Sequence, residues 1–257
     1  MTIAFFSDVH GNLPALQAVL ADLDRRRPDM VFCLGDLVGY APWPNEVVNE
    51  VRRRGIPTLA GNYDQGIGLA SANCGCAYKT DREQDLGAQS IAYTNAVIGA
   101  DARRYLRLLP KHMRLDFQDE PCTLNLLMVH GSPRKINEYL FEDRPEASFG
   151  RVLQDANADV LLFGHTHRPF RRAVAYEQAG ETRYRHALNI GSVGKPKDGD
   201  PRAAYLLLHL DEHTTLTDPD SLRSELVRVE YDVEEAARAI IASPLPDEYA
   251  DMLRKAY

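Results

Sequence analysis

The stretch Phe163-Gly164-His165-Thr166-His167-Arg168-Pro169 follows an apolar run, residues 159–163, and sets two histidines one residue apart after a glycine. A short apolar run that ends in a turn is typical of a buried strand, and open α/β sheets bind ligands at the carboxyl ends of such strands. Two imidazoles at that position favour a metal site, although either ring could instead cap a loop or fill a gap in the core.

Four other apolar runs also end in a break that pairs glycine with an acid, an amide or an imidazole. The breaks are Ser7-Asp8-Val9-His10-Gly11, Gly35-Asp36-Leu37-Val38-Gly39, Gly61-Asn62-Tyr63-Asp64 and His130-Gly131-Ser132-Pro133. The runs at 3–6, 30–34 and 56–60 alternate with helical patterns that begin near Asn12 and Pro44, and such alternation predicts a parallel sheet. We expect five strands to deliver seven side chains to a single sheet edge: Asp8, His10, Asp36, Asn62, His130, His165 and His167.

These side chains offer nitrogen and oxygen ligands without thiolate, a set that suits divalent ions such as manganese, iron, zinc or cobalt. Seven ligands are too many for one catalytic ion and match two ions that share a bridge. Because a carboxylate has two oxygens, we expect one of the two aspartates to be that bridge. Two ions about 4 Å apart acidify a water between them and hold a phosphoryl group for in-line displacement. The pattern therefore predicts hydrolysis of phosphoesters.

Together the five segments resemble the calcineurin-like metallophosphoesterase superfamily over residues 1 to about 200. The resemblance implies an α/β fold, a four-layer α/β/β/α sandwich, which we expect to form a single domain over residues 1–257. It implies that Asp8, His10 and His167 hold one ion, that Asn62, His130 and His165 hold the other, and that Asp36 bridges them. A metal-bridging hydroxide would attack phosphorus, with Asp36, Asn62 and His130 as catalytic residues. We expect Mn²⁺, with Fe, Zn²⁺, Co²⁺ and Ni²⁺ as alternatives.

The third break departs from the pattern of the family. Relatives with strong monoesterase activity usually carry Gly-Asn-His-Asp there, and their histidine helps to protonate the leaving oxygen; this chain has Tyr63. A phenol, with a reference pKa of about 10, is a poor general acid at neutral pH. Small bacterial members that lack the histidine resemble phosphodiesterases. We therefore expect a phosphodiesterase that acts on a small phosphodiester.

Tyr63 and Arg168 are the predicted substrate-binding residues. Arg168 follows a predicted ligand and could hold a phosphate oxygen bidentately, or it could pair with a surface carboxylate. Tyr63 could instead be a ring that covers the metal cleft without a role in turnover. Lys195 and Lys197 are further candidates for recruiting phosphate.

Two other hypotheses, a different hydrolase and a scaffold, stay open at this stage. The chain could be a protein serine/threonine phosphatase or a dinucleoside polyphosphate hydrolase, or it could be a non-catalytic metal-binding scaffold. Scaffolds of that kind tend to lose ligands, and all seven positions are present here.

The remaining chain predicts a helical insertion and a β-rich second half. Residues 66–110 have helical spacing, and we expect two helices that flank the active-site cleft, the first containing Cys74 and Cys76. The strand-like runs between residues 170 and 231 should supply the second sheet, and two helices should follow it.

Composition limits the partners. The chain has 257 residues, is 44% hydrophobic and carries a net charge of −7, with a pI of about 5.6. An acidic chain argues against binding of long nucleic acid but not of a small phosphorylated substrate. Neither a leader pattern nor an apolar run of about 20 residues is present, so we expect no membrane partner and a soluble, cytoplasmic protein. We expect the four cysteines to be free thiols, and the sequence does not set the oligomeric state.

Overall fold

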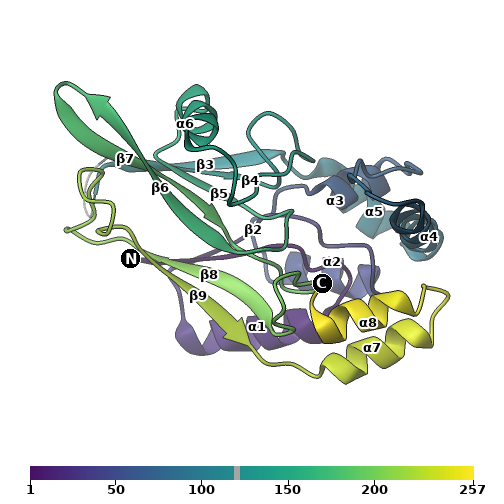
Figure 1. Cartoon of the computed structure of the whole chain (residues 1–257). Coiled ribbons are helices and arrows are strands. Elements are labelled where there is room, and N and C mark those ends of the chain that lie inside the picture. The colour runs from purple at the N-terminus through teal and green to yellow at the C-terminus, as the bar shows by residue number, and fades with distance from the viewer. Residues whose placement is uncertain (119–121) are drawn as a thin grey trace.

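The computed structural model describes residues 1–118 and 122–257. Two β-sheets face each other, with helices on their outer sides (Figure 1). One sheet has the strand order β2 (Met30–Cys33), β1 (Thr2–Phe6), β8 (Ala203–His209), β9 (Arg223–Val229). The other has the order β3 (His112–Phe117), β4 (Leu124–Val129), β5 (Val160–Phe163), β7 (Glu181–Asn189), β6 (Phe170–Gln178). The predicted α/β/β/α sandwich is confirmed.

The layers follow from side chains that alternate between the two faces of each central strand. In β1, Ile3 and Phe5 pack between the sheets, whereas Ala4 and Phe6 pack beneath the helices. In β4, Met128 packs between the sheets and Leu127 packs against α6 (Glu146–Asp155). A strand that is buried on both faces needs apolar residues at every position, which is why these strands appear as uninterrupted apolar runs.

Local signals set the helices on the outer face of the first sheet. The side chain of Asn12 accepts a hydrogen bond from the backbone of Ala15, and Pro14 lies in the first turn of α1 (Leu13–Arg26). Helix α2 (Pro44–Arg53) likewise begins at a proline. The two helices predicted after the β-rich half are present as α7 (Val233–Ile241) and α8 (Glu248–Lys255). They pack against each other.

The prediction of a third strand over residues 56–60 is wrong. This segment forms only an isolated parallel bridge between Thr58 and Cys33. Pro57 has no N–H to donate, and the backbone N–H of Ala60 donates to the carbonyl of Pro110 at 2.7 Å instead of to a strand.

The prediction of a single parallel sheet edge is also wrong. Strands β1 and β2 pair in parallel in one sheet, and β4 and β5 pair in parallel in the other. Nor does the second half of the chain form one sheet, because β8 and β9 join β1 whereas β6 and β7 join β5. Apolar periodicity encodes which residues are buried but not which strand edge they pair with. The predicted ligands therefore meet where the ends of two sheets come together.

After α2, three more helices precede β3: α3 (Asn62–Gly68), α4 (Asp81–Val97) and α5 (Ala100–Leu108). Cys74 and Cys76 lie in irregular chain between α3 and α4, so their predicted place in the first helix of the insertion is wrong. Gly75 between them has a φ of +73°, a conformation that interrupts a helix. Among the described residues, no helix combines the length and apolarity that crossing a membrane requires.

Candidate metal centre

The predicted ligands lie in strained turns directly after the strands. Five of them have a left-handed backbone, with φ of 55° at Asp8, 51° at His10, 55° at Asp36, 66° at His165 and 59° at His167. This conformation costs a residue other than glycine about 1–2 kcal/mol. Such strain persists only where the surrounding structure imposes it, and it is concentrated at functional sites.

Hydrogen bonds between the turns hold the backbone in this strained conformation. The backbone N–H of Asp8 donates to Gly35 and that of His10 donates to Asp36, both at 2.9 Å. The carboxylate of Asp8 accepts the N–H of His165 at 3.0 Å, which links the two sheets. The turns also pack closely: a Cβ on Gly164 would lie 2.3 Å from Oδ2 of Asp8.

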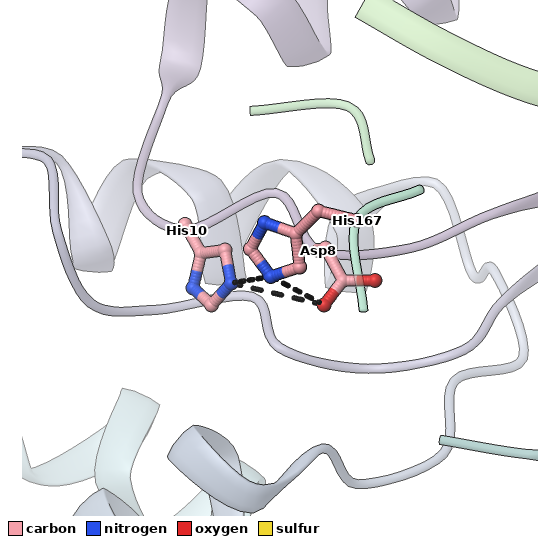
Figure 2. Close-up of side chains that lie close together, drawn as sticks. All are labelled: Asp8, His10 and His167. Carbon is pink, nitrogen blue, oxygen red and sulfur yellow. Dashed lines mark hydrogen bonds and ion pairs between the residues drawn. The ribbon is translucent and has the colours of Figure 1, made fainter. Parts of the chain in front are cut away.

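Asp8, His10 and His167 form the first group of possible metal ligands (Figure 2). Nε2 of His167 lies 3.3 Å from Oδ1 of Asp8, and Nε2 of His10 lies 3.7 Å from the same oxygen. All three side chains are buried.

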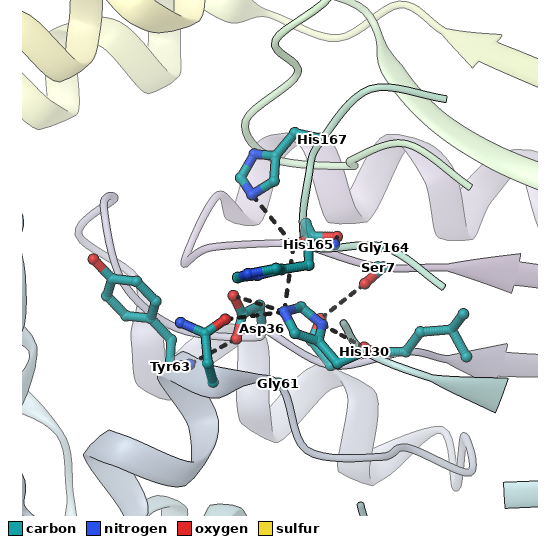
Figure 3. Close-up of polar contacts among 12 residues, drawn as sticks. Ser7, Asp36, Gly61, Tyr63, His130, Gly164, His165 and His167 are labelled. Atoms are coloured by element: carbon teal, nitrogen blue, oxygen red, sulfur yellow. Dashed lines mark hydrogen bonds and ion pairs between the residues drawn. The ribbon is translucent and has the colours of Figure 1, made fainter. Parts of the chain in front are cut away.

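Asp36, His130 and His165 form the second group, which Figure 3 shows. Nε2 of His130 lies 3.2 Å from Oδ2 of Asp36 and 3.1 Å from Oδ1 of Asn62. The same Oδ2 of Asp36 lies 3.6 Å from Nε2 of His10 in the first group. One oxygen of Asp36 thus lies between the two groups, as a bridging ligand must, while its other oxygen accepts the N–H of Tyr63 at 2.8 Å.

Backbone carbonyls fix the tautomers of three histidines. Nδ1 of His10 lies 3.0 Å from the carbonyl of Val38, and Nδ1 of His130 lies 2.8 Å from that of Leu34. Nδ1 of His167 lies 2.5 Å from the carbonyl of Lys195. Because a carbonyl only accepts, each Nδ1 carries the proton, and in the neutral ring Nε2 offers its lone pair to the centre.

These donors fit two cations. Oδ1 of Asp8 and Nε2 of His165 are buried and have no hydrogen-bond partner among the described residues. Burial of an unpaired carboxylate oxygen or imidazole nitrogen costs free energy unless a ligand such as a metal ion binds to it. Oxygen and imidazole donors without thiolate suit divalent ions of the manganese, iron, cobalt, nickel and zinc series.

The electrostatics match this geometry. Burial lowers the pKa of His10 to about 3 and, together with the charge on His130, lowers the pKa of His165 to about 3, so both rings stay neutral. Burial also lowers the pKa of His130, but the carboxylate of Asp36 outweighs it and raises this pKa to about 9. Burial raises the pKa of Asp36, and the charge on His130 then holds it well below its usual range. The carboxylate of Asp36 therefore favours positive charge at this centre.

Cys74 and Cys76 contact this centre through Asn62. The amide Nδ2 of Asn62 donates to the carbonyl of Cys74 at 2.9 Å and lies 3.3 Å from Sγ of Cys76. These contacts turn Oδ1 of Asn62 toward His130. All four cysteines are free, as predicted.

Asp64 stabilises the two turns that contain Asp36 and Asn62. It is fully buried, and its carboxylate accepts the N–H of Gly61 at 3.0 Å and that of Leu37 at 2.9 Å. Burial and the charge on Asp36 raise the pKa of Asp64 to about 7. Its position three residues after Gly61 is a capping-box spacing, and that signal could have identified it from sequence.

Comparison with known proteins identifies the family. Residues 1–213 match the model of the calcineurin-like phosphoesterase superfamily domain. The chain belongs to this superfamily. An uncharacterized protein of Methanocaldococcus jannaschii is 32% identical in an alignment of 257 positions that covers 95% of this chain and 94% of that protein.

Two solved structures match over the whole length of the chain. A metallophosphoesterase from Sphaerobacter thermophilus is 28% identical, with a TM-score of 0.74 and coverage of 100% of this chain and 99% of that one. A hypothetical protein from Pyrococcus horikoshii shares the fold with a TM-score of 0.78 at 22% identity, covering 100% and 98% of the two chains. The divalent metal chemistry of this metallophosphoesterase superfamily fits the two groups of ligands described above.

The two predicted substrate-binding residues occupy different environments. Tyr63 is 1% exposed, and its ring packs edge-on against His10 with centroids 5.5 Å apart. Figure 3 shows its hydroxyl pointing away from Asp36, and burial raises its pKa well above the usual value. This placement favours the alternative in which Tyr63 is a covering ring. Arg168 is exposed and borders a cavity beside the centre, and its Nε donates to the carbonyl of Lys197 at 2.9 Å.

Proposed function

We propose that this superfamily member is a phosphodiesterase that uses two divalent ions to hydrolyse a small phosphodiester, with Mn²⁺ as the preferred ion. The observation that carries the proposal is the position of Asp36, whose Oδ2 lies between Nε2 of His10 and Nε2 of His130. A carboxylate oxygen shared by two groups of imidazoles suits a binuclear centre.

The protein residues would hold and orient this chemistry. Asp8, His10 and His167 would hold one ion, and Asn62, His130 and His165 the other, with Asp36 between them. When bound, such ions polarise the phosphoryl oxygens and lower the pKa of water. The water oxygen would form a bond to phosphorus and lose a proton, the bond from phosphorus to one ester oxygen would break, and that oxygen would leave with the bonding electron pair and take up a proton.

Proton delivery to the leaving oxygen separates diesters from alkyl monoesters. Tyr63 takes the place of the family's histidine, and its raised pKa makes it a poor acid. Esters with weakly basic leaving groups should therefore react fastest. Because the cavity beside the centre has a volume of about 310 Å³, it suits a small molecule better than a phosphoprotein surface. The presence of every predicted ligand argues against a scaffold without turnover.

The test compares two esters with one leaving group. The protein is stripped of metal, reloaded with Mn²⁺ and assayed with bis(p-nitrophenyl) phosphate and p-nitrophenyl phosphate. We expect two ions per chain by elemental analysis, faster cleavage of the diester, and a loss of at least about 100-fold in kcat for Asp36→Ala. Equal rates for D36A and the parent would refute the proposal.

The free thiols suit a reducing compartment, and we propose a cytoplasmic location on that ground. Fractionation of cells of the source organism, with an antibody against the protein, tests it.

A further inference from the structure

An aromatic cavity adjoins both groups of metal ligands. It is lined by Tyr40, Tyr139, Phe141 and Tyr249, and its volume is about 310 Å³. The ring of Tyr139 lies over that of His165, with centroids 4.0 Å apart, and Tyr40 meets His10 edge-on at 4.7 Å. The aromatic wall therefore starts at the metal centre and leads away from it.

A buried cation lies among these rings. Lys195 is 4% exposed, and its Nζ lies 5.1 Å from the ring centre of Tyr40 and 6.0 Å from that of Tyr249. In the part of the chain that the structure describes, no carboxylate lies within 4.0 Å of Nζ. A buried ammonium without a counter-ion is unfavourable unless a ligand supplies the negative charge.

Further charges line the same cavity. Lys79, Arg168 and Lys197 add three cationic side chains to Lys195, and Glu83 is the one acidic side chain among the described lining residues, so these side chains sum to a formal charge of +3. Glu83 accepts the backbone N–H of Lys79 at 2.6 Å. The carboxylates of Asp8 and Asp36 face the histidines and form no ion pair with these cations.

This charge exceeds what a simple diester can balance. The phosphodiester at the metal centre carries one negative charge, and two divalent ions would neutralise it. The cations among the aromatic rings therefore match a second anionic group on the same molecule, and the rings match a planar base that can stack on them.

We propose that the cavity binds one nucleoside arm of the substrate together with a second phosphate on that arm. The substrate class is then a nucleotidyl phosphodiester that carries a further phosphate. This inference rests on the proposed phosphodiesterase function, because it assigns the cavity to the ester that the metal centre cleaves.

The first experiment measures binding without turnover. The Mn²⁺-loaded protein is titrated calorimetrically with thymidine 3′,5′-bisphosphate, thymidine 5′-monophosphate and 2-deoxyribose 5-phosphate. We expect Kd to rise about tenfold when the 3′-phosphate is removed and about tenfold again when the base is removed. Equal affinities for the three compounds would overturn the inference.

Variants of three lining residues test which side chains recognise the second phosphate and which recognise the base. Lys195→Met keeps the apolar stem beside the rings and should abolish the preference for the bisphosphate over the monophosphate. Lys197→Met, at a more exposed position, should weaken the same preference and serves if K195M does not fold. Phe141→Ala, at a side chain that is 42% exposed, should remove the preference for the base. Retention of both preferences in all three variants would contradict the assignment.

Matched controls lie outside the cavity. Lys255→Met changes an exposed lysine on α8, and Leu108→Ala changes an apolar side chain on α5 that is 72% exposed. Both should keep the affinities and the order of the parent. If they lose the order as the cavity variants do, the effect is not specific to the cavity and the inference fails.

A parallel assay separates this inference from the function on which it rests. The methyl, thymidine 5′- and 3′-phosphothymidine 5′-esters of p-nitrophenyl phosphate share the scissile bond and leaving group. We expect kcat/KM to increase in that order. Cleavage of all three at one rate would overturn the inference and leave the phosphodiesterase standing. Ordered affinities without any cleavage would overturn the phosphodiesterase and leave a nucleotide-binding cavity.

Discussion

Nε2 of His10 lies 3.2 Å from Nε2 of His167, although 157 residues separate them in the chain. In both rings Nδ1 faces a backbone carbonyl, so in the neutral rings two lone pairs point at each other. Such an arrangement is repulsive unless a cation lies between the nitrogens, and the stability of the protein should therefore depend on metal.

We expect chelation to lower Tm and Mn²⁺ to restore it. A ligand that binds only the native state at 100 times its Kd stabilises that state by about 2.7 kcal/mol. Differential scanning fluorimetry across a Mn²⁺ series measures the shift. His167→Ala should abolish most of it, and the exposed His213→Ala should not. A Tm that is independent of Mn²⁺ would contradict the binuclear centre.

Cys76→Ala should weaken metal binding without removing a ligand. The amide of Asn62 loses its contact with the thiol, so Oδ1 is less firmly oriented toward His130. Loss of such outer-sphere contacts typically costs about 10–100-fold in metal affinity or activity. Cys76→Ser restores an acceptor and should recover much of the loss, and Cys122→Ala, in the core between the sheets, is the control. Competition with a chelating dye measures the affinity, and equal values for C76A and C122A would count against the orienting role.

Tyr63→His should raise monoesterase activity relative to diesterase activity. An imidazole can protonate a basic leaving oxygen at neutral pH, whereas the phenol of Tyr63 has a raised pKa. Steady-state rates with glycerol 2-phosphate, whose alkoxide leaving group is basic, and with bis(p-nitrophenyl) phosphate give the ratio. Tyr63→Phe is the control: because Oη has no hydrogen-bond partner among the described residues, this variant should keep the parent ratio. An unchanged ratio in Y63H would remove the argument for the diester.

His186 should make stability fall as pH decreases. It is fully buried on β7, and burial, followed by the charge on Arg171, lowers its pKa from 6.5 to about 4. Between these values the unfolded chain binds a proton that the folded protein does not, so stability rises with pH across the window and is lost as pH falls through it. Over two pH units this linkage amounts to about 2–3 kcal/mol.

Urea unfolding at pH 7 and pH 4.5 measures that linkage in the parent and in His186→Phe. The loss of stability between the two pH values should be about 2–3 kcal/mol smaller in the variant. The exposed His213→Phe is the control and should follow the parent. Identical losses in H186F and the parent would refute a titrating role for His186.

The chemistry of the centre could be predicted from sequence because each ligand is encoded locally. Each of the seven predicted ligands lies within four residues of the end of an apolar run and within three residues of a glycine: Asp8, His10, Asp36, Asn62, His130, His165 and His167. A buried strand and the tight turn at its end can be predicted from a few consecutive residues, and the polar side chains in such turns are the candidate ligands.

Long-range pairing is not recorded in this way. The segment at 56–60 forms a single β-bridge, and the strands that precede the predicted ligands belong to two sheets. Hydrophobic periodicity could not predict this, because it does not say which strand edges pair. The contact of Asn62 with Cys76 and the placing of Lys195 among tyrosines likewise depend on how distant loops pack. Sequence by itself thus determined the family and predicted the ligands, whereas only the tertiary structure decided which groups surround them, since those neighbours are brought together by packing and not by spacing along the chain.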